Sequence, residues 1–338
     1  MTEAPLRPGR GCAAARRIAA CLSLLGLACG ASYLDPESAG SDFVVQGEYA
    51  ASGSIPAAQV VALGGGEFDL VMLSPSLPGV GPTAPARTVR RGRRAGELVR
   101  WSDGEFEAVY RDGRIRGGND RSLHFSLARI ERRSPTLGAA PPPGATRLFG
   151  GGINAFDGNV DARGFLEAGA TSRESFGDAR IHLEFRTPFM PDSRGQARGN
   201  SGVYLQGRYE IQVLDSFGLE GAWNECGGIY KIAAPLVNMA LPPLAWQTYD
   251  IEFRAARFDA DGQRREPARV RVEHNGVLIH DDVALPGPTG RGDAETPSPG
   301  PLVLQDHWNP VVYRNIWVLE HGNKADARPS AESTSKAG

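Results

Sequence analysis

Cysteine is scarce in this chain of 338 residues, which has only Cys12, Cys21, Cys29 and Cys226. We expect the first two to be removed with an export signal, and Cys29 is a candidate for lipidation. Cys226 is then left without a partner, which excludes an intramolecular disulfide in the mature protein. Stability must therefore come from hydrophobic cores. Cys226 is predicted to be a small buried residue, because a catalytic thiol would need a nearby base and partial exposure.

The chain also lacks a charge imbalance, because its formal net charge is −2 at pH 7. The one basic cluster, RTVRRGRR at residues 87–94, has no interleaved aromatic side chains. We interpret it as a solvated loop, and a contact with a polyanion or a membrane surface is the alternative. The composition therefore gives no indication of a nucleic-acid partner.

The apolar segment IAACLSLLGLA, residues 18–28, is too short to span a bilayer. It follows a positive segment that contains Arg7, Arg10, Arg16 and Arg17. This order is typical of an export signal, which we place at residues 1–30. The protein is therefore expected in the periplasm or the cell envelope.

Small residues surround Cys29 at the end of this signal. A bacterial lipoprotein signal resembles Leu-Ala-Gly-Cys, and here Gly26 stands where that signal has Leu. One reading is lipidation of Cys29, which would anchor the protein to a membrane. The other readings are ordinary signal-peptidase cleavage nearby, and an uncleaved anchor or a misread start.

Glycine and proline are abundant, with 43 and 25 residues, and no long segment has a helical period. Both observations favour short strands joined by many turns. The Asp112-Gly113 pair is a hairpin signal in the first half of the chain. The predicted organisation is a flexible tether at 31–42, a small β-rich module with a structural or docking role at 43–133, a proline-rich linker at 134–144, a main β-domain at 145–322 and a disordered tail at 323–338.

Strands of the main domain have two distinct faces. In ARIHLEFRTPF, the apolar residues at 181, 183 and 185 alternate with His182, Glu184 and Arg186. RYEIQVLD alternates in the same way and places Glu210 and Gln212 opposite an apolar face. Two-faced strands bury their apolar faces against each other in pairs of sheets. The pattern therefore predicts an all-β sandwich or jelly roll.

The polar faces carry carboxylates and amides, and we expect them to lie on adjacent strands of one surface. Tyr204, Tyr230, Trp223 and Trp246 lie in neighbouring segments. Hydrogen-bonding side chains beside aromatic rings are typical of a carbohydrate-binding surface. A solvated outer face is the alternative.

Glu210 and Asp215 are five residues apart, so an unbroken strand would send them to opposite faces. Either Asp215 caps the turn DSFG at the end of the strand, or a β-bulge turns it onto the face of Glu210. Glu210 itself is expected to be exposed on an open concave sheet. The spacing E-x-Q-x-x-D resembles the E-x-D-x-x-E strand of jelly-roll β-glucanases, with Gln212 replacing the central Asp and Asp215 the final Glu.

Seven motifs follow the order seen in the 3-keto-disaccharide hydrolase family, over residues 145–320 or roughly half of the chain. They are HLEFRTPF, RGNSGVYLQGRYEIQVLDSFG, CGGIYK, APLVN, PPLAWQTYDIEF, HNGVLIHDDV and GPLVLQDHWNPVVYRNIWV. The sequence is most similar to members of the planctomycete type, some of which carry a similar small β-module in front. The resemblance implies an all-β, concanavalin A-like jelly-roll sandwich.

The resemblance also implies a carbohydrate substrate whose sugar carries a ketone at C3. Such a ketone acidifies the proton on C2, so that a base can form an enolate and the C1 substituent can leave by elimination before water adds. This chemistry needs a base, a donor to the enolate oxygen and an acid for the leaving group. The acid–base candidates are Glu210, His182, Asp215 and His307, and the alternative for His307 is an ordinary loop histidine.

The remaining candidates would bind hydroxyl groups, stabilise the enolate oxygen or stack on the sugar. They are Asn200, Tyr204, Gln212, Arg186, Glu184, Tyr230, Trp246, Gln305 and Arg314. No cofactor is otherwise indicated, but His182 and Glu184 on one face have a spacing that suits a divalent metal. The competing function is a non-catalytic glycan-binding module of the cell envelope, which would need the aromatic rings but no acid–base residues.

Overall fold

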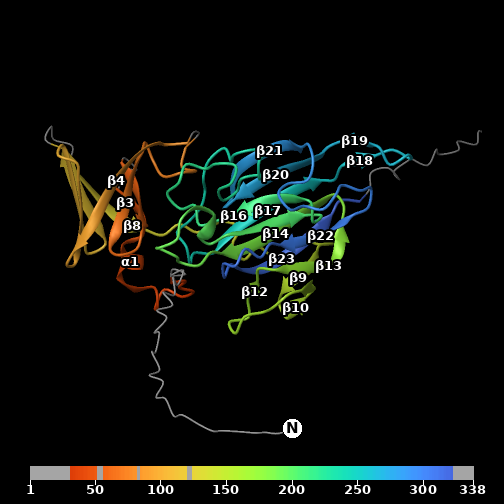
Figure 1. The fold of residues 1–338 in the computed structure, drawn as a ribbon, viewed down its shortest axis with the longest axis horizontal. Helices are drawn as coiled ribbons and strands as arrows, with labels where there is room; N and C mark the ends of the chain where they lie inside the picture. Colours follow the sequence, from red (N-terminus) through yellow and green to blue (C-terminus); the bar gives the residue numbers. More distant parts are fainter. Residues whose placement is uncertain (1–30, 52–55, 82–83, 120–123, 323–338) are drawn as a thin grey trace, which may run out of the picture.

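The computed structural model describes residues 31–51, 56–81, 84–119 and 124–322 (Figure 1). The predicted export signal, Cys29 and the predicted tail at 323–338 lie outside these ranges. Across the described ranges, no helix is both long enough and apolar enough to cross a membrane. The described chain is nearly all β, with one short α-helix, α1 (Gly40–Val45), and one 3-10 turn, η1 (Gly195–Ala197).

The first half of the chain forms a closed antiparallel barrel, coloured red to yellow at one end of the molecule in Figure 1. Strand β1 closes it by pairing with both β2 and β8. Tyr49, Phe68 and Trp101 are buried in its core. The barrel strands are β1 (Gly47–Ala50), β2 (Ala57–Ala62), β3 (Glu67–Ser74), β4 (Ala86–Ala95), β5 (Leu98–Ser102), β6 (Phe106–Arg111), β7 (Arg114–Asn119) and β8 (Phe125–Ile130).

The basic cluster at residues 87–94 lies in β4, so its interpretation as a loop is wrong. Its arginines pair with carboxylates, most of them on the barrel surface. Arg91 lies 2.6 Å from Asp69, and Arg90 lies 2.8 Å from Asp103. Because carboxylates neutralise these charges locally, the strand has little unbalanced positive charge to attract a polyanion.

The second half forms a sandwich of two antiparallel sheets. The larger sheet has the order β10-β9-β23-β14-β17-β20-β21, with β12 also paired to β23, and the smaller sheet has the order β11-β13-β22-β15-β16. The larger sheet contains β9 (Thr146–Gly150), β10 (Ile153–Asn154), β12 (Leu166–Glu167), β14 (Ala179–Arg186), β17 (Gln247–Arg254), β20 (Ala268–His274), β21 (Val277–Leu285) and β23 (Val312–Glu320). The smaller sheet contains β11 (Phe156–Asp157), β13 (Ala170–Phe176), β15 (Ser201–Leu205), β16 (Tyr209–Val213) and β22 (Gly300–Leu304), and β18 (Arg257–Phe258) pairs separately with β19 (Arg264–Glu266).

The two sheets meet in one hydrophobic core, which confirms the predicted all-β, jelly-roll-like sandwich. Leu183 and Phe185 of β14 pack in the same buried cluster as Val203 of β15 and Ile211 of β16. The polar residues that alternate with them therefore point away from the core, on opposite sides of the sandwich. The expectation that these polar residues share one surface on adjacent strands is wrong, because β14 and β16 belong to different sheets.

Cys226 lies in this core, as the sequence predicts. It is a free, fully buried cysteine, and its Sγ lies 3.2 Å from the hydroxyl of Tyr249. Burial raises the pKa of the thiol to about 11. A buried thiol that stays protonated at neutral pH is not a nucleophile.

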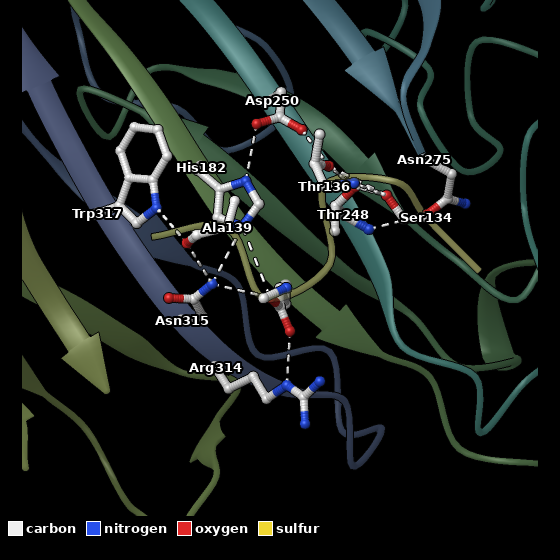
Figure 2. Close-up of polar contacts among 12 residues, drawn as sticks. Ser134, Thr136, Ala139, His182, Thr248, Asp250, Asn275, Arg314, Asn315 and Trp317 are labelled. Carbon is white, nitrogen blue, oxygen red and sulfur yellow. Dashed lines mark hydrogen bonds and ion pairs between the residues drawn. The ribbon is translucent and has the colours of Figure 1, made fainter. Parts of the chain in front are cut away.

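The segments expected to be a tether and a linker both pack against the sandwich. In the first, Tyr33 and Phe189 exchange two backbone hydrogen bonds of 3.0 Å, and Ala39 is buried. In the second, residues 134–139 lie against the outer face of the larger sheet and bond to its side chains (Figure 2). The segments predicted as a flexible tether and a bare linker therefore both contain residues that pack against the folded domains.

The barrel and the sandwich also share buried apolar contacts. Phe217 of the sandwich packs in one cluster with Val61, Val71 and Leu73 of the barrel. Phe189 of the sandwich belongs to the barrel core. The two halves are therefore held together by packing as well as by the chain between them.

Candidate active site

A cavity of about 140 Å³ opens on the outer face of the smaller sheet. It collects six of the candidates predicted from the sequence, and loops that follow the strands supply the rest of its wall. The lining residues are Gln196, Tyr204, Glu210, Gln212, Tyr230, Gly290, Arg291, Gln305, Asp306, His307 and Trp308.

Two paired strands form the floor of this cavity. Tyr204 on β15 lies directly opposite Glu210 on β16, and Gly202 lies opposite Gln212. Alternation sends Ile211 into the core and its neighbours in β16 into the cavity. A Cβ atom at Gly202 would lie 2.4 Å from Oε1 of Glu210, so the missing side chain makes room for the carboxyl group.

Glu210 is buried, with 3% of its surface exposed, so the expectation of an exposed glutamate is wrong. The Tyr204 hydroxyl donates a hydrogen bond of 2.9 Å to its Oε2. Burial raises the pKa of Glu210 to about 7, although the hydrogen bond from Tyr204 opposes this shift. A carboxyl group with this pKa can both accept and donate a proton near neutral pH.

The loop that contains Gly290 closes one side of the cavity. Thr289 holds the loop against β16, because the Glu210 N–H donates to its Oγ1 at 2.6 Å. Gly290 has a φ of +53°, and a Cβ atom there would lie 3.0 Å from the Tyr204 hydroxyl and 3.2 Å from Oε2 of Glu210. Glycine at this position lets the backbone approach the hydrogen-bonded pair and shield it from water.

Amide side chains line the opposite side of the cavity. Gln212 donates through its Nε2 to Oδ1 of Asn200 at 2.8 Å and to Oε1 of Gln196 at 3.4 Å. Because both contacts use the nitrogen, the Oε1 of Gln212 is left to accept a hydrogen bond from a ligand. Asn200, a predicted substrate-binding residue, instead lies behind the cavity wall and orients Gln212.

Trp308 stands at the rim and is 80% exposed. Its backbone N–H donates to Oδ1 of Asp306 at 2.7 Å, and its φ of 56° is unusual for a bulky residue. Strained backbone of this kind is concentrated at functional sites. His307 beside it is half-buried and faces the cavity, with its ring centroid 5.3 Å from that of Trp308.

The sequence analysis missed five lining residues: Gln196, Gly290, Arg291, Asp306 and Trp308. Trp308 had a detectable signal, because an aspartate two residues before it and a proline two residues after it mark a turn that can display the indole. The others had none, since their positions depend on how distant loops converge.

Asp215 does not reach the cavity. It follows the end of β16, where its Oδ2 accepts a hydrogen bond of 2.6 Å from Nε of Arg198 and its Oδ1 accepts one of 3.4 Å from the Phe217 N–H. The hydrogen bond from the Phe217 N–H is typical of a residue that caps a turn. Of the two alternatives that the sequence left open for Asp215, the structure therefore contains the turn cap. Both members of the ion pair are buried, which leaves Asp215 no contact with a ligand in the cavity.

His182 lies on the opposite outer face of the sandwich, beneath residues 134–139 (Figure 2). Glu184, on the same face of β14, accepts a hydrogen bond from the Gly138 N–H of this segment. Nδ1 of His182 is 2.8 Å from Oδ1 of Asp250, and its Nε2 is 3.8 Å from Oε1 of Glu184. Burial lowers the pKa of His182, but the two carboxylates outweigh burial and raise it overall. The structure thus separates this pair from Glu210 by the full thickness of the sandwich.

The proposed metal pair of His182 and Glu184 does not fit a metal site. Both ring nitrogens of His182 face protein groups, and Glu184 accepts hydrogen bonds from the Gly138 N–H at 2.5 Å and from Asn315 at 2.9 Å. Within the described ranges, no three His, Cys, Asp or Glu side chains are grouped so that they could hold a metal ion. The pair instead attaches the covering segment to the sheet.

Glu184 should make the fold sensitive to acid. Burial opposes its ionisation, but the neighbouring His182 and hydrogen bonds from Asn315, Gly138 and Arg314 outweigh burial and lower its pKa to about 2. A carboxylate with a lowered pKa contributes stability above its unfolded pKa, near 4.5, and that contribution is lost as the pH falls toward 2. The difference of about 2.5 pKa units corresponds to about 3 kcal/mol.

We expect the stability of a Glu184→Gln variant to change less than that of the unmodified chain between pH 5 and pH 3. Denaturant unfolding at several pH values in this range measures the effect. Glu174→Gln, at an exposed glutamate of β13, is the control, and its stability should vary with pH as that of the unmodified chain does. Parallel curves for the unmodified chain and Glu184→Gln would contradict the prediction.

Arg186, Arg314 and Trp246 form a third group, away from both sites. The guanidinium of Arg314 lies 4.0 Å from the ring centroid of Trp246, and that of Arg186 lies 5.1 Å from it. Nε of Arg314 also bonds to Glu184 at 2.7 Å. These three predicted substrate-binding residues therefore contact one another and the larger sheet, and they do not line the Glu210 cavity.

Solved structures similar to this chain come from Parabacteroides distasonis ATCC 8503. A crystal structure from Parabacteroides distasonis ATCC 8503, named a "putative glycosyl hydrolase", is 32% identical over 53% of this chain and 85% of its own, with a TM-score of 0.49. A second structure of the same name and organism is 20% identical over 52% of this chain and 99% of its own, with a TM-score of 0.37. No curated protein matches the sequence.

Residues 151–319, half of the chain, match the family described as the 3-keto-alpha-glucoside-1,2-lyase-like domain. The matched segment contains the whole smaller sheet, all of the larger sheet except β9 and the last residue of β23, and every residue that lines the Glu210 cavity. This protein therefore belongs to the 3-keto-alpha-glucoside-1,2-lyase-like domain family, and that membership supports an enzyme that acts on glycosides.

Proposed function

We propose that this protein cleaves 3-keto-glycosides by elimination across C1 and C2 followed by hydration, with Glu210 as the acid–base residue. The observation that carries the proposal is a buried carboxyl group, with a pKa of about 7, that faces a cavity lined by amides and aromatic rings. Family membership supports the substrate class.

In the first step, the Glu210 carboxylate removes the proton from C2 of the bound 3-keto sugar. The electron pair of the C2–H bond forms a C2–C3 double bond, and the C3 carbonyl becomes an enolate. The enolate then re-forms the carbonyl, C1–C2 becomes a double bond, and the C1–O bond breaks. The proton held by Glu210 passes to the departing oxygen. Water then adds across C1 and C2, so that the net reaction is hydrolysis.

The cavity wall supplies groups for the other roles. Arg291 and His307 can donate hydrogen bonds to the enolate oxygen, while Oε1 of Gln212 can accept one from a sugar hydroxyl. Burial raises the pKa of Tyr204, as does the neighbouring Glu210, so the phenol stays protonated and keeps donating to the carboxyl group. Tyr204 thereby holds the carboxyl group in place over the sugar.

The competing function, a non-catalytic glycan-binding module, needs the aromatic rings but gives no reason for a buried glutamate. Burying a carboxyl group without a cationic partner costs stability above its usual pKa. A binding module could place a glutamine there at no such cost. The Glu210 environment therefore favours the enzyme.

The test uses the purified protein with glucosides and their 3-keto forms, in D₂O. Elimination and hydration should place deuterium at C2 of the released 3-keto sugar, whereas direct displacement at C1 leaves that proton in place. Free 3-keto sugar incubated without protein corrects for spontaneous exchange. Release of sugar without enzyme-dependent deuterium, or equal cleavage of the unoxidised glucoside, would overturn the proposed reaction.

Trp308 should contribute to binding but not to the fold. We expect Trp308→Ala to raise KM for a 3-keto-glycoside about fivefold, the equivalent of about 1 kcal/mol of lost stacking. Stability should change by no more than about 0.5 kcal/mol, because the ring is exposed. Steady-state kinetics measures this effect, and Leu236→Ala, at a side chain that is 66% exposed and outside the cavity, is the control. An unchanged KM would remove Trp308 from the binding site.

We also propose that the protein is exported and carries a lipid on Cys29, because the apolar segment and small residues at 18–31 have that pattern. The expected outcome is a mature chain that begins with a diacylglyceryl-modified Cys29. Mass spectrometry of the membrane fraction tests this. A mature chain that begins after Cys29 would reject lipidation and retain export.

A further inference from the structure

One loop of the sandwich, residues 190–200, runs from the barrel to the Glu210 cavity. At its start, Asp192 lies directly against the barrel turn after β2, because a Cβ atom at Gly64 would be 1.9 Å from its Oδ1. At its end, Asn200 orients Gln212 behind the cavity wall. The loop thus touches both parts of the molecule within about ten residues.

Two arginines of this loop donate to backbone carbonyls at the end of β2. Nη2 of Arg194 bonds to the carbonyl of Leu63 at 2.6 Å, and Nη1 of Arg198 bonds to that of Ala62 at 3.1 Å. Nη2 of Arg198 also lies 3.5 Å from Oε1 of Gln46, which is itself fixed by the Ala62 N–H at 2.9 Å. The barrel therefore presents a fixed row of acceptors to the loop.

Arg198 is the central residue of this contact. Its Nε bonds to Asp215 of the sandwich, while its two terminal nitrogens reach the barrel. The whole side chain is buried, with 5% of its surface exposed. The planar fork of a guanidinium can satisfy acceptors in several directions at once, which the single ammonium of a lysine cannot do with the same geometry.

The residues two positions before and after Arg198 complete the connection to the cavity. Nδ2 of Asn200 donates to the backbone carbonyl of Gln196 at 2.8 Å and to its Oε1 at 3.2 Å, and Oδ1 of Asn200 accepts from Gln212. Gln196 and Gln212 both line the cavity. A shift of the loop would therefore turn both amides away from a bound sugar.

We propose that the barrel is a positioning element of the active site, and that it holds the Gln196 and Gln212 amides toward the substrate through Arg198, which acts as a positioning residue. This inference rests on the proposed function for its kinetic consequence. It assigns a role to a module that lies outside the matched family domain. The barrel does not touch the substrate; it fixes the loop that does.

The test compares variants of the full chain with 3-keto-glycoside as the substrate. Arg198→Lys keeps the charge beside Asp215 but cannot keep all of the contacts with the barrel, and it should raise KM about tenfold. The dependence of kcat on pH should stay the same, because the contact between Glu210 and Tyr204 is elsewhere. Arg194→Met should also raise KM. Arg194→Lys, whose ammonium can still reach the Leu63 carbonyl, should raise KM less than Arg194→Met does.

Arg87→Met is the matched control. Arg87 also crosses the interface between the barrel and the sandwich, where it bonds to Glu220 at 3.0 Å and to the carbonyl of Gly218, but it does not contact the loop. Its loss should leave KM unchanged. A KM that rises equally in Arg87→Met would show a general effect of the interface and overturn the proposal.

Amide hydrogen exchange without substrate separates this inference from the proposed function. The Asn200 N–H, which donates to Asn309 at 2.7 Å, and the Arg198 N–H should exchange faster in Arg198→Lys than in the unmodified chain, and should not change in Arg87→Met. If the unmodified chain cleaves no glycoside, the proposed function fails while faster exchange still supports the positioning. Unchanged exchange in a folded Arg198→Lys variant would overturn the positioning role.

Discussion

Glu210→Gln is expected to lower turnover of a 3-keto-glycoside by about 10²–10⁴-fold. The change keeps the size of the side chain and its hydrogen bond from Tyr204, but it removes the basicity that the first step requires. Saccharide binding should largely survive, because the amide can still reach the same hydroxyl group. Single-turnover kinetics together with titration of the ligand separates the two effects. A variant with the original turnover would remove Glu210 from catalysis.

The same substitution is expected to stabilise the fold at high pH. The pKa of Glu210 is raised from 4.5 to about 7, so between these values the folded protein keeps a proton that the unfolded chain has lost. Stability therefore falls as the pH rises from about 4.5 to 7, by about 3 kcal/mol in total, and stays low above that range. A glutamine has no titrating proton, so the variant does not lose this stability as the pH rises.

Denaturant unfolding of both proteins between pH 4 and pH 8 measures this difference. The gain from Glu210→Gln should be small at pH 4 and largest at pH 8. Glu174→Gln, at an exposed glutamate of β13 in the same sheet, is the control and should show no such trend. A gap between Glu210→Gln and the unmodified chain that does not vary with pH would contradict a raised pKa.

Asp215→Ala is expected to destabilise the fold by about 3–5 kcal/mol, because it leaves the buried guanidinium of Arg198 without its carboxylate. The pH dependence of kcat in the folded fraction should not change, since Asp215 is outside the cavity. Urea unfolding and the pH profile of kcat measure the two parts. A stable variant whose pH profile has lost one limb would instead make Asp215 an acid–base residue.

Two further variants sharpen this test. Asp215→Leu combined with Arg198→Met replaces both buried charges and should cost much less than the single change, because no unpaired charge remains. Asp282→Ala removes the exposed partner of Arg269 and should cost much less stability than Asp215→Ala. An equal loss of stability in all three variants would show that burial of the pair is not the cause.

The sequence alone determined the class of fold and much of the cavity. Alternation in RYEIQVLD placed Ile211 in the core and directed Glu210 and Gln212 outward, and β16 has this arrangement. Seven ordered motifs indicated the family that the matched residues confirm. These features are readable because alternation is a property of the local backbone, which fixes the two faces of a strand wherever it pairs.

Only the tertiary structure decided which polar faces share a site. His182 and Glu210 lie on strands with the same pattern, but β14 and β16 belong to different sheets and point to opposite sides of the sandwich. The sequence also could not show that residues 134–139 cover His182, or that Arg198 would engage Asp215. Strand pairing and the covering of a face depend on contacts between residues far apart in the chain, and no local period encodes them.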